Sequence, residues 1–148
     1  ALIGMIYGRT HTRDVTKLGG LLKVIPFISA VYVIAGLASL GLPGFSGFVA
    51  EMNIFVGAFE NDNIFYRIGT VIAVSAIVVT AVYILRVVGI MLMGPVNNEA
   101  YLNLERVRWY EKLGIFLLLL PIIAIGVAPL WLSELILQSL DPFLKGVL

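Results

Sequence analysis

One carboxylic acid stands alone in a long apolar stretch of the chain. Glu51 is the single charged residue between positions 24 and 59. Burial in lipid disfavours the charged form of a carboxyl group, so an acid at that depth can exchange protons near neutral pH. Ionisable groups inside a membrane are expensive and usually functional. The sequence therefore predicts proton or cation handling with Glu51 as the titrating group. The alternative is a structural acid satisfied by nearby backbone amides.

The residues before Glu51 predict a break in the helix that carries it. Gly41, Pro43, Gly44 and Gly47 follow one another closely, and Glu51 comes four residues after the last of them. Gly and Pro release backbone groups from the helical ladder, and in hydrocarbon such groups must find partners inside protein or line a wet cavity. Transporters build ion sites at mid-membrane from a broken helix beside an ionisable group. The pattern is typical of such a site.

Three further side chains are secondary candidates. Arg86 could pair with Glu51, although snorkelling to the headgroups is the interpretation we favour. His11, with an unperturbed pKa of ~6.5 for its residue type, could relay protons at a channel mouth, but it sits in a polar loop where a solvated histidine is common. Lys23 could admit protons at the helix entry, but an interfacial anchor is the more usual role.

The composition predicts an integral membrane protein. The 148 residues are 60% hydrophobic and only 13% charged, whereas soluble domains carry about 25% charged residues. A net charge of +1 without a basic stripe argues against a nucleic-acid partner. The chain has no cysteine and a single histidine, so thiolate chemistry is excluded and a metal site is not expected.

The apolar runs predict an all-α membrane protein with three spans. A straight helix over 24–59 would reach ~54 Å, against a hydrocarbon core of ~30 Å, so we expect helices near 24–40 and 48–59 with a non-helical link at Gly41–Gly47. The other spans are expected over 64–93 and 113–132, the latter kinked by Pro121 and Pro129. Between and after them we expect a loop with an interfacial helix over 97–112 and an amphipathic tail over 133–148.

The distribution of Lys and Arg predicts an orientation. The loop over 8–23 holds four such residues and the loop over 94–112 holds three, and three spans place both loops on the same side, which should be the cytoplasm. We expect a multi-pass protein of a bacterial inner membrane. Residues 1–7 have the character of the last two turns of a helix, so we expect residues 1–148 to be the C-terminal piece of a longer chain.

Three motifs carry a resemblance to a known family. They are R-T-H-T-R-D at 9–14, G-G-L at 19–21 and A-S-L-G-L-P-G-F-S-G-F-V-A-E-M-N-I-F-V-G-A-F at 38–59. They resemble the chain M family of antiporter-like membrane subunits in the proton-pumping NADH:quinone oxidoreductase, respiratory complex I. The resemblance covers essentially the whole chain, is most specific over 38–59, and implies the C-terminal part of a fourteen-helix fold with two inverted five-helix repeats.

The resemblance also implies a role for the acid. In such proteins an ionisable residue beside the broken helix is an essential proton-transfer group. Sister subunits carry Lys there and chain M carries Glu, a pattern that Glu51 matches. The family's other essential groups, a glutamate and lysines on earlier helices, would lie before Ala1. The resemblance does not extend to Arg86.

The implied function is proton translocation coupled to electron transfer from NADH to quinone, as part of an enzyme complex. No redox cofactor is expected in this chain; NAD, FMN, iron–sulfur clusters and quinone would belong to partner subunits. The implied partners are the lipid bilayer and other membrane subunits, including neighbouring antiporter-like ones. Two alternatives stay open: a subunit of a multisubunit sodium/proton antiporter or membrane-bound hydrogenase, and a purely structural membrane anchor.

Overall fold

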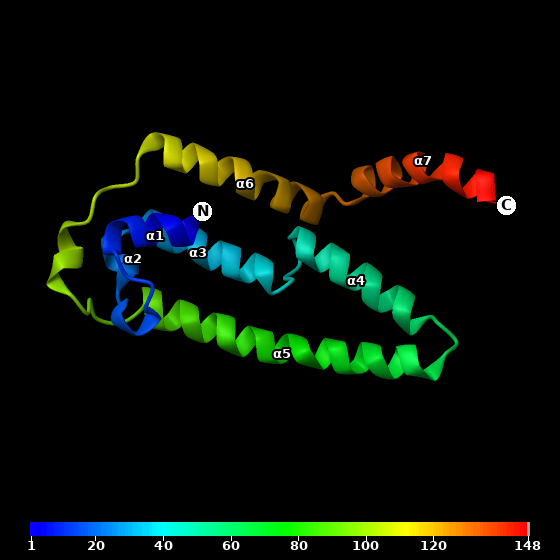
Figure 1. Ribbon diagram of the computed structural model, residues 1–148, viewed down its shortest axis with the longest axis horizontal. Helices are drawn as coiled ribbons and strands as arrows, with labels where there is room; N and C mark the ends of the chain where they lie inside the picture. The colour runs from blue at the N-terminus through cyan, green and yellow to red at the C-terminus, as the bar shows by residue number, and fades with distance from the viewer. Residues whose placement is uncertain (148) are drawn as a thin grey trace.

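The computed structural model describes residues 1–147, without the side chains at positions 103, 137 and 141–147. Every regular element in this described part is a helix, as predicted. In chain order the elements are α1 (Leu2–Thr10), η1 (Val15–Lys17), α2 (Leu21–Val24), α3 (Pro26–Ser39), α4 (Ser46–Phe59), α5 (Ile64–Leu92), η2 (Glu99–Asn103), α6 (Trp109–Val127) and α7 (Leu130–Val147). The helices form an elongated bundle in which α3 and α4 lie end to end along α5 (Figure 1).

Two of the helices are long and apolar enough to cross a membrane. They are α5, with 29 residues, and α6, with 19. At ~1.5 Å per residue they reach ~44 Å and ~29 Å, so α6 matches a hydrocarbon core of ~30 Å and α5 extends beyond it. Apolar side chains of α5 such as Ile72, Val79 and Val82 are mostly exposed, which suits contact with lipid or neighbouring helices and not with water.

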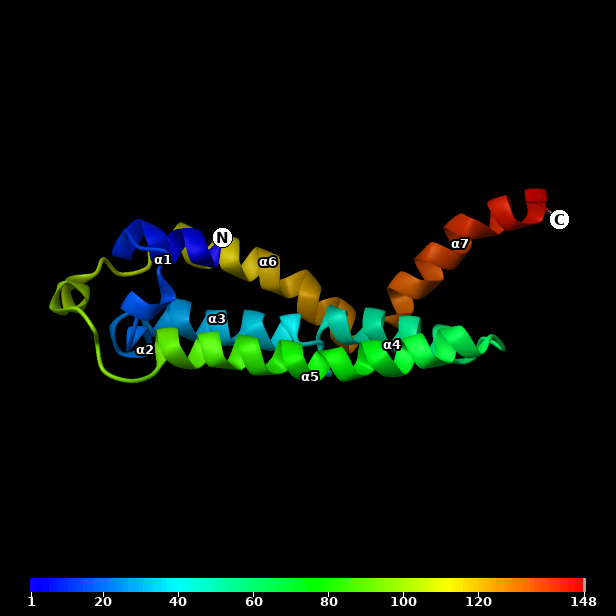
Figure 2. The ribbon, with the colours of Figure 1, turned by 60° about the horizontal axis from the view of Figure 1, so that its bottom comes forward.

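The predicted break is confirmed. Helix α3 ends at Ser39 and α4 begins at Ser46. Each has 14 residues, or ~21 Å, so neither crosses ~30 Å of hydrocarbon alone, but end to end they do. Figure 2 shows the two helices following α5 along its length, with the break near the middle of α5. In a membrane that α5 crosses, this position corresponds to the middle of the bilayer.

The start of α3 differs from the prediction of one helix from about 24 to 40. Leu21–Val24 form the separate turn α2, and Ile25 takes φ −128° and ψ 66° before Pro26 opens α3. The reason is local, since proline disfavours the helical conformation of the residue before it and is well suited to the first turn of a helix. At the other side of the break, α4 begins two residues before the predicted position 48.

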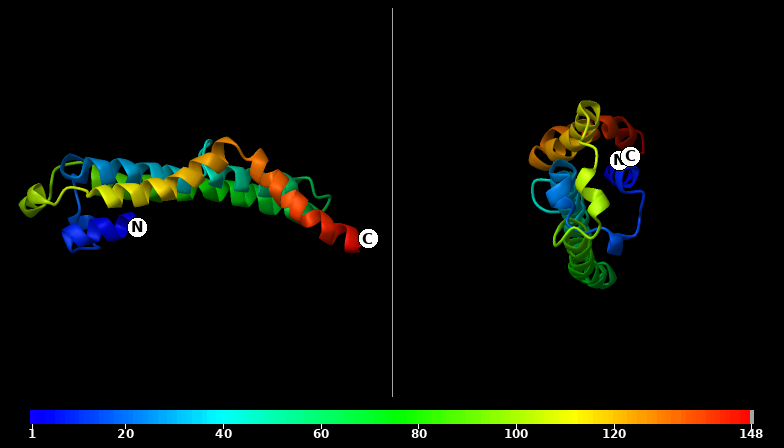
Figure 3. Two further views of the ribbon diagram at one scale, coloured as in Figure 1. Left: turned by 90° about the horizontal axis from the view of Figure 1, so that it is seen from above. Right: turned by 90° about the vertical axis from the view of Figure 1, so that its left-hand side faces the viewer.

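The last predicted span also has different ends. Trp109 and Tyr110, expected in an interfacial helix, form the first turn of α6, and that interfacial helix is reduced to the short η2. Helix α6 ends at Val127 instead of position 132, because Pro129 interrupts the chain before α7. Pro121 stays inside α6. Helix α7 covers most of the predicted tail and diverges from the bundle (Figure 3); position 148 lies outside the described residues.

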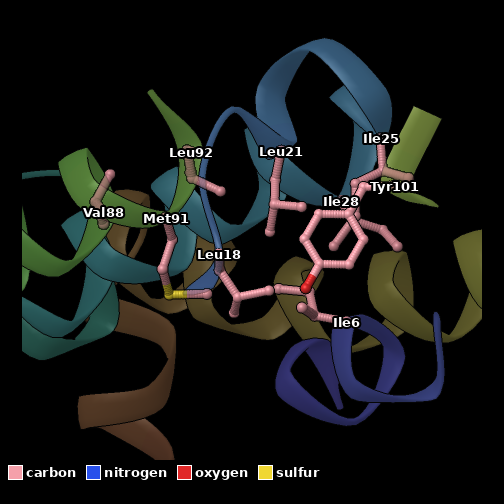
Figure 4. Packing of buried hydrophobic residues seen from close by; sticks show 9 residues of the cluster. All are labelled: Ile6, Leu18, Leu21, Ile25, Ile28, Val88, Met91, Leu92 and Tyr101. Atoms are coloured by element: carbon pink, nitrogen blue, oxygen red, sulfur yellow. The ribbon is translucent and has the colours of Figure 1, made fainter. Parts of the chain in front are cut away.

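The best-packed region lies where the loops meet, at one end of the bundle (Figure 1), and Figure 4 shows its side chains. Its buried side chains come from α1, α2, α3, the end of α5 and the loops between them, and we call them the loop-end cluster: Ile6, Leu18, Leu21, Ile25, Ile28, Val88, Met91, Leu92 and Tyr101. Burying such side chains stabilises a fold by about 1.5–3 kcal/mol each relative to leaving them exposed. This cluster fixes the start of α3 against the end of α5.

Candidate functional site

The break consists of two glycine turns. At the end of α3, the Gly41 N–H donates to the Ala38 carbonyl at 3.2 Å, and Gly41 has φ +65°. Before α4, the Phe45 N–H donates to the Leu42 carbonyl at 3.2 Å across Pro43 and Gly44, and Gly44 has φ +97°. Proline followed by a residue of positive φ is the signature of a type II turn. Both positions require the conformational freedom of glycine.

The Glu51 carboxyl group lies against the first of these turns. Glu51 is partly buried on α4. A Cβ atom placed on Gly41 would collide with its Oε2 and lie 3.2 Å from its Oε1. The acid reaches the turn only because residue 41 has no side chain. Among the side chains and backbone groups that the structure describes, none forms a hydrogen bond or ion pair with this carboxyl group.

Direct backbone packing holds the two half-helices together. A Cβ on Gly47 would lie 3.1 Å from the Ala38 carbonyl oxygen and 3.6 Å from the Gly41 Cα, so the first turn of α4 rests on the last turn of α3. From the other side, Gly126 of α6 touches the backbone of Gly44. The break is thus a defined packing arrangement of backbone against backbone.

The ends of α3 and α4 bring partial charges of opposite sign to the break. A helix carries partial positive charge at its N-terminus and partial negative charge at its C-terminus, and here the C-terminus of α3 meets the N-terminus of α4. Phe45, the N-cap of α4, offers no side-chain cap. Unsatisfied amides and carbonyls at such a junction can order water beside the Glu51 carboxyl group.

An apolar groove leads toward the break. Its volume is about 520 Å³, and residues of α1, α3, α5 and α6 line it, with Ser39 at the end of α3 among them. Its polar side chains are Tyr32, Ser39 and Tyr83. A largely apolar lining does not hold ordered water, so the groove suits apolar groups and is not by itself a proton path.

The structure does not join the three secondary candidates to Glu51. Arg86 is exposed on α5, and no ion pair links it to Glu51 within the described residues. Lys23 is exposed on α2. His11 is exposed, caps α1 with φ 53°, and meets the Tyr7 ring edge-on with centroids 6.3 Å apart. Their proposed roles in proton transfer stay predictions.

Sequence reasoning missed an ion pair that joins α1 to α6. The Arg9 Nη2 lies 2.6 Å from the Glu111 Oε2, with the two side chains only 9% and 20% exposed. The Arg9 guanidinium also donates to the carbonyls of Glu105 and Met5, at 3.0 and 3.1 Å. The two charges are 102 positions apart, and sequence spacing contains no signal for pairing at that distance.

The R-T-H-T-R-D segment runs from the last two residues of α1 into the loop that follows. Arg13 lies over the Tyr7 ring, 4.7 Å from its centroid. The Asp14 Oδ1 accepts hydrogen bonds from the hydroxyl and the backbone N–H of Thr16, at 2.6 and 3.0 Å. These bonds stabilise the charged carboxylate and lower the pKa of Asp14 from 3.8. Arg13, Asp14 and Thr16 therefore stabilise the loop that follows α1.

Comparison with known proteins supplies the family. The family model described as "NADH:quinone oxidoreductase/Mrp antiporter, TM" matches residues 1–80. A Synechocystis protein named NAD(P)H-quinone oxidoreductase chain 4-1 is 38% identical over 146 residues, which are 95% of this chain and 27% of that protein. A Rickettsia bellii protein named NADH-quinone oxidoreductase subunit M is 32% identical over 128 residues, 86% of this chain and 25% of that protein.

These relatives are much longer than the chain. An Acaryochloris marina protein named NAD(P)H-quinone oxidoreductase chain 4 is 36% identical over 90% of this chain, which covers 26% of that protein. The chain thus spans about a quarter of the length of the curated relatives it matches. The matched residues 1–80 include the break and Glu51. The chain belongs to the NADH:quinone oxidoreductase/Mrp antiporter transmembrane family.

Proposed function

We propose that this chain is part of a proton-translocating, antiporter-like membrane subunit of an NADH:quinone oxidoreductase, in which Glu51 carries protons past the break. One observation supports this most: the Glu51 carboxyl group rests on the Gly41 turn, between two half-helices, without an ion pair in the described residues. A carboxylic acid tolerates an apolar surrounding when protonated and not when charged. A change in the polarity around Glu51 would therefore shift the balance between its protonated and its charged form.

The transfer step requires only this chain's own groups and water. Glu51 would accept a proton from water ordered at the junction of α3 and α4, and release it when the surroundings favour the charged form. Arg86, Lys23 and His11 are secondary candidates: a charge partner, an entry residue and a relay. Electron transfer would take place in partner subunits that hold NAD, FMN, iron–sulfur clusters and quinone. The chain itself has no cysteine to bind an iron–sulfur cluster.

The setting of the proposal is a bacterial inner membrane. The Lys- and Arg-rich loops around η1 and η2 would face the cytoplasm, and the mostly exposed apolar side chains of α5 would meet lipid and neighbouring membrane subunits, including other antiporter-like ones. A second function fits the same site, since the matched family also includes Mrp antiporters. In that case the site would exchange protons for sodium ions, and transport would depend on sodium.

The test is Glu51→Gln in the full-length protein within its complex, in sealed membrane vesicles. Glutamine keeps the shape but cannot release a proton. We expect the complex to assemble and proton translocation per electron to collapse, while Glu51→Asp retains most of it. The control is Glu60→Gln, an exposed acid at the end of α4, which should behave as the unmodified protein. Normal translocation by Glu51→Gln would contradict the proposal and favour a structural anchor.

A further inference from the structure

One glycine of α6 is in direct contact with the break. The three atoms nearest to a Cβ built on Gly126 are the Gly44 carbonyl oxygen, the Gly44 carbonyl carbon and the Phe45 carbonyl carbon, all at colliding distance. All three belong to the backbone, so no side-chain rotation can make room. The other glycine of α6 is Gly114, and a Cβ built on it would have no atom within 4 Å. Gly126 is therefore the place where α6 rests on the break.

This contact falls on the turn that starts α4. Gly44 is the second central residue of the Pro43–Gly44 turn, and α4 begins two residues later. Glu51 lies on the second turn of α4, and its carboxyl group rests on Gly41, at the other turn of the break. A shift of the Pro43–Gly44 turn would move α4, because a helix transmits displacement along its axis. The distance between the acid and the Gly41 turn therefore depends on where α6 sits.

We propose that Gly126 is a positioning residue, which seats α6 on the Pro43–Gly44 turn and thereby fixes the Glu51 carboxyl group against Gly41. Pro121 contributes, since it lies five residues before Gly126 in α6 and its missing N–H removes the helical hydrogen bond to the Leu117 carbonyl. The missing hydrogen bond lets α6 bend at Pro121, so that its last turn reaches the Pro43–Gly44 turn. The inference rests on the proposed function of Glu51 and adds the element that sets its geometry.

Charged side chains of the neighbouring helices do not provide an alternative mechanism. Helix α3 has no charged residue, and the charges of α6 are Glu111 and Lys112, in its first turn at the far end from Gly126. On α5 the charges are Arg67 and Arg86, and neither pairs with Glu51 in the described residues. Titratable tyrosines on α3, α5 and α6 are Tyr32, Tyr66, Tyr83 and Tyr110. Substitution of Gly126 changes none of these groups.

The test compares Gly126→Ala with Gly114→Ala in the full-length protein within its complex. The readout is modification of Glu51 by a hydrophobic carbodiimide, which adds to protonated carboxyl groups, followed by mass spectrometry across a pH series. We expect Gly126→Ala to change the rate of Glu51 modification several-fold and to shift its pH profile. Gly114→Ala should match the unmodified protein. Equal rates and profiles for the two assembled variants would overturn the proposal.

A second variant covers the case in which Gly126→Ala does not assemble. Pro121→Ala introduces a helix-favouring residue at an exposed position. This change should straighten α6 and move Gly126 away from the Pro43–Gly44 turn, so we again expect the rate of Glu51 modification to change. An unaltered profile in Pro121→Ala would overturn the proposal. Carbodiimide modification reports the position and protonation of the carboxyl group whether or not protons pass through it. Its outcome is therefore independent of the Glu51→Gln translocation test.

Discussion

The loop end and the break both depend on glycines in close contact, but they use them differently. At the loop end, a Cβ on Gly20 would lie 2.9 Å from the Pro95 carbonyl carbon, and the partly buried ion pair of Arg9 and Glu111 joins α1 to α6. At the break, Gly41, Gly47 and Gly126 bring backbone and the Glu51 carboxyl group together, and none of the side chains that the structure describes forms an ion pair with that carboxyl group.

This difference suggests that the loop end serves stability and that the break serves transport. A charged side chain that is held by a fixed partner contributes to stability. A region that holds an acid without an ion-pair partner beside strained backbone turns gives up stability, and the acid remains able to change its charge. We therefore expect substitutions at the loop end to reduce assembly or thermal stability. Substitutions at the break should reduce proton translocation in enzyme that still assembles.

Gly41→Ala should have the largest effect. The added methyl group would collide with the Glu51 carboxyl group and force a positive φ on alanine, a strain of about 1–3 kcal/mol. We expect translocation per electron to fall strongly, since the acid can no longer rest on the turn. The control is Gly57→Ala, where nothing lies within 4 Å. If Gly41→Ala assembled and pumped normally, the contact with the turn would have no part in transport.

Gly20→Ala should weaken the loop end and leave transport intact. Gly20 has φ +64°, and the new methyl group would meet backbone atoms of Pro95 and Val96, so we expect a loss of about 2 kcal/mol. Thermal unfolding of the purified complex measures it. Gly8→Ala, in open space on α1, should be neutral. A normal melting profile but defective pumping in Gly20→Ala would reverse the assignment of the two regions.

The Arg9–Glu111 pair is expected to have a smaller effect. A double-mutant cycle with Arg9→Gln and Glu111→Gln should give a coupling of about 1.5–3 kcal/mol in stability, because both side chains are largely buried and hydrogen-bonded. The exposed pair of Arg108 and Glu105, 3.5 Å apart with side chains 61% and 76% exposed, should give less than about 1 kcal/mol. Equal couplings would mean that burial does not distinguish the two pairs.

Loss of the Asp14 charge at acid pH should have the smallest effect, at η1. The hydroxyl and the backbone N–H of Thr16 lower the pKa of the Asp14 carboxyl group from its unfolded value of 3.8. The carboxylate therefore stabilises the turn fully at pH values above 3.8, and this stabilisation is lost as the pH falls through the lowered pKa. Hydrogen exchange of the Thr16 amide should speed up at acid pH relative to its intrinsic rate, and Asp14→Ala should do the same at neutral pH. An unchanged Thr16 amide in Asp14→Ala would show that the side chain does not hold the turn.

Sequence reasoning predicted the features that local chemistry determines. The break over 41–47 follows from Gly and Pro, and the isolation of Glu51 follows from the apolar residues around it. The two-residue offsets at Pro26 and Ser46 arise because turn chemistry and not hydrophobicity sets helix ends. Residue types alone thus sufficed to locate the break.

Long-range contacts could not be predicted in this way. Gly126 and Gly114 are alike in sequence, since each is a glycine in an apolar run, yet only Gly126 touches the break. Arg9 and Glu111 likewise gave no sign that they pair across most of the chain. Periodicity describes which face of a helix is apolar, but it does not say which residue of another helix meets that face.

The most direct measurement of the central claim is an infrared difference spectrum of the full complex during turnover. If Glu51 binds and releases protons at the break, the unmodified protein shows a protonated-carboxyl band that changes during turnover. That band should shift in Glu51→Asp and vanish in Glu51→Gln. A spectrum in which this band persists unchanged in Glu51→Gln would show that the protons pass elsewhere.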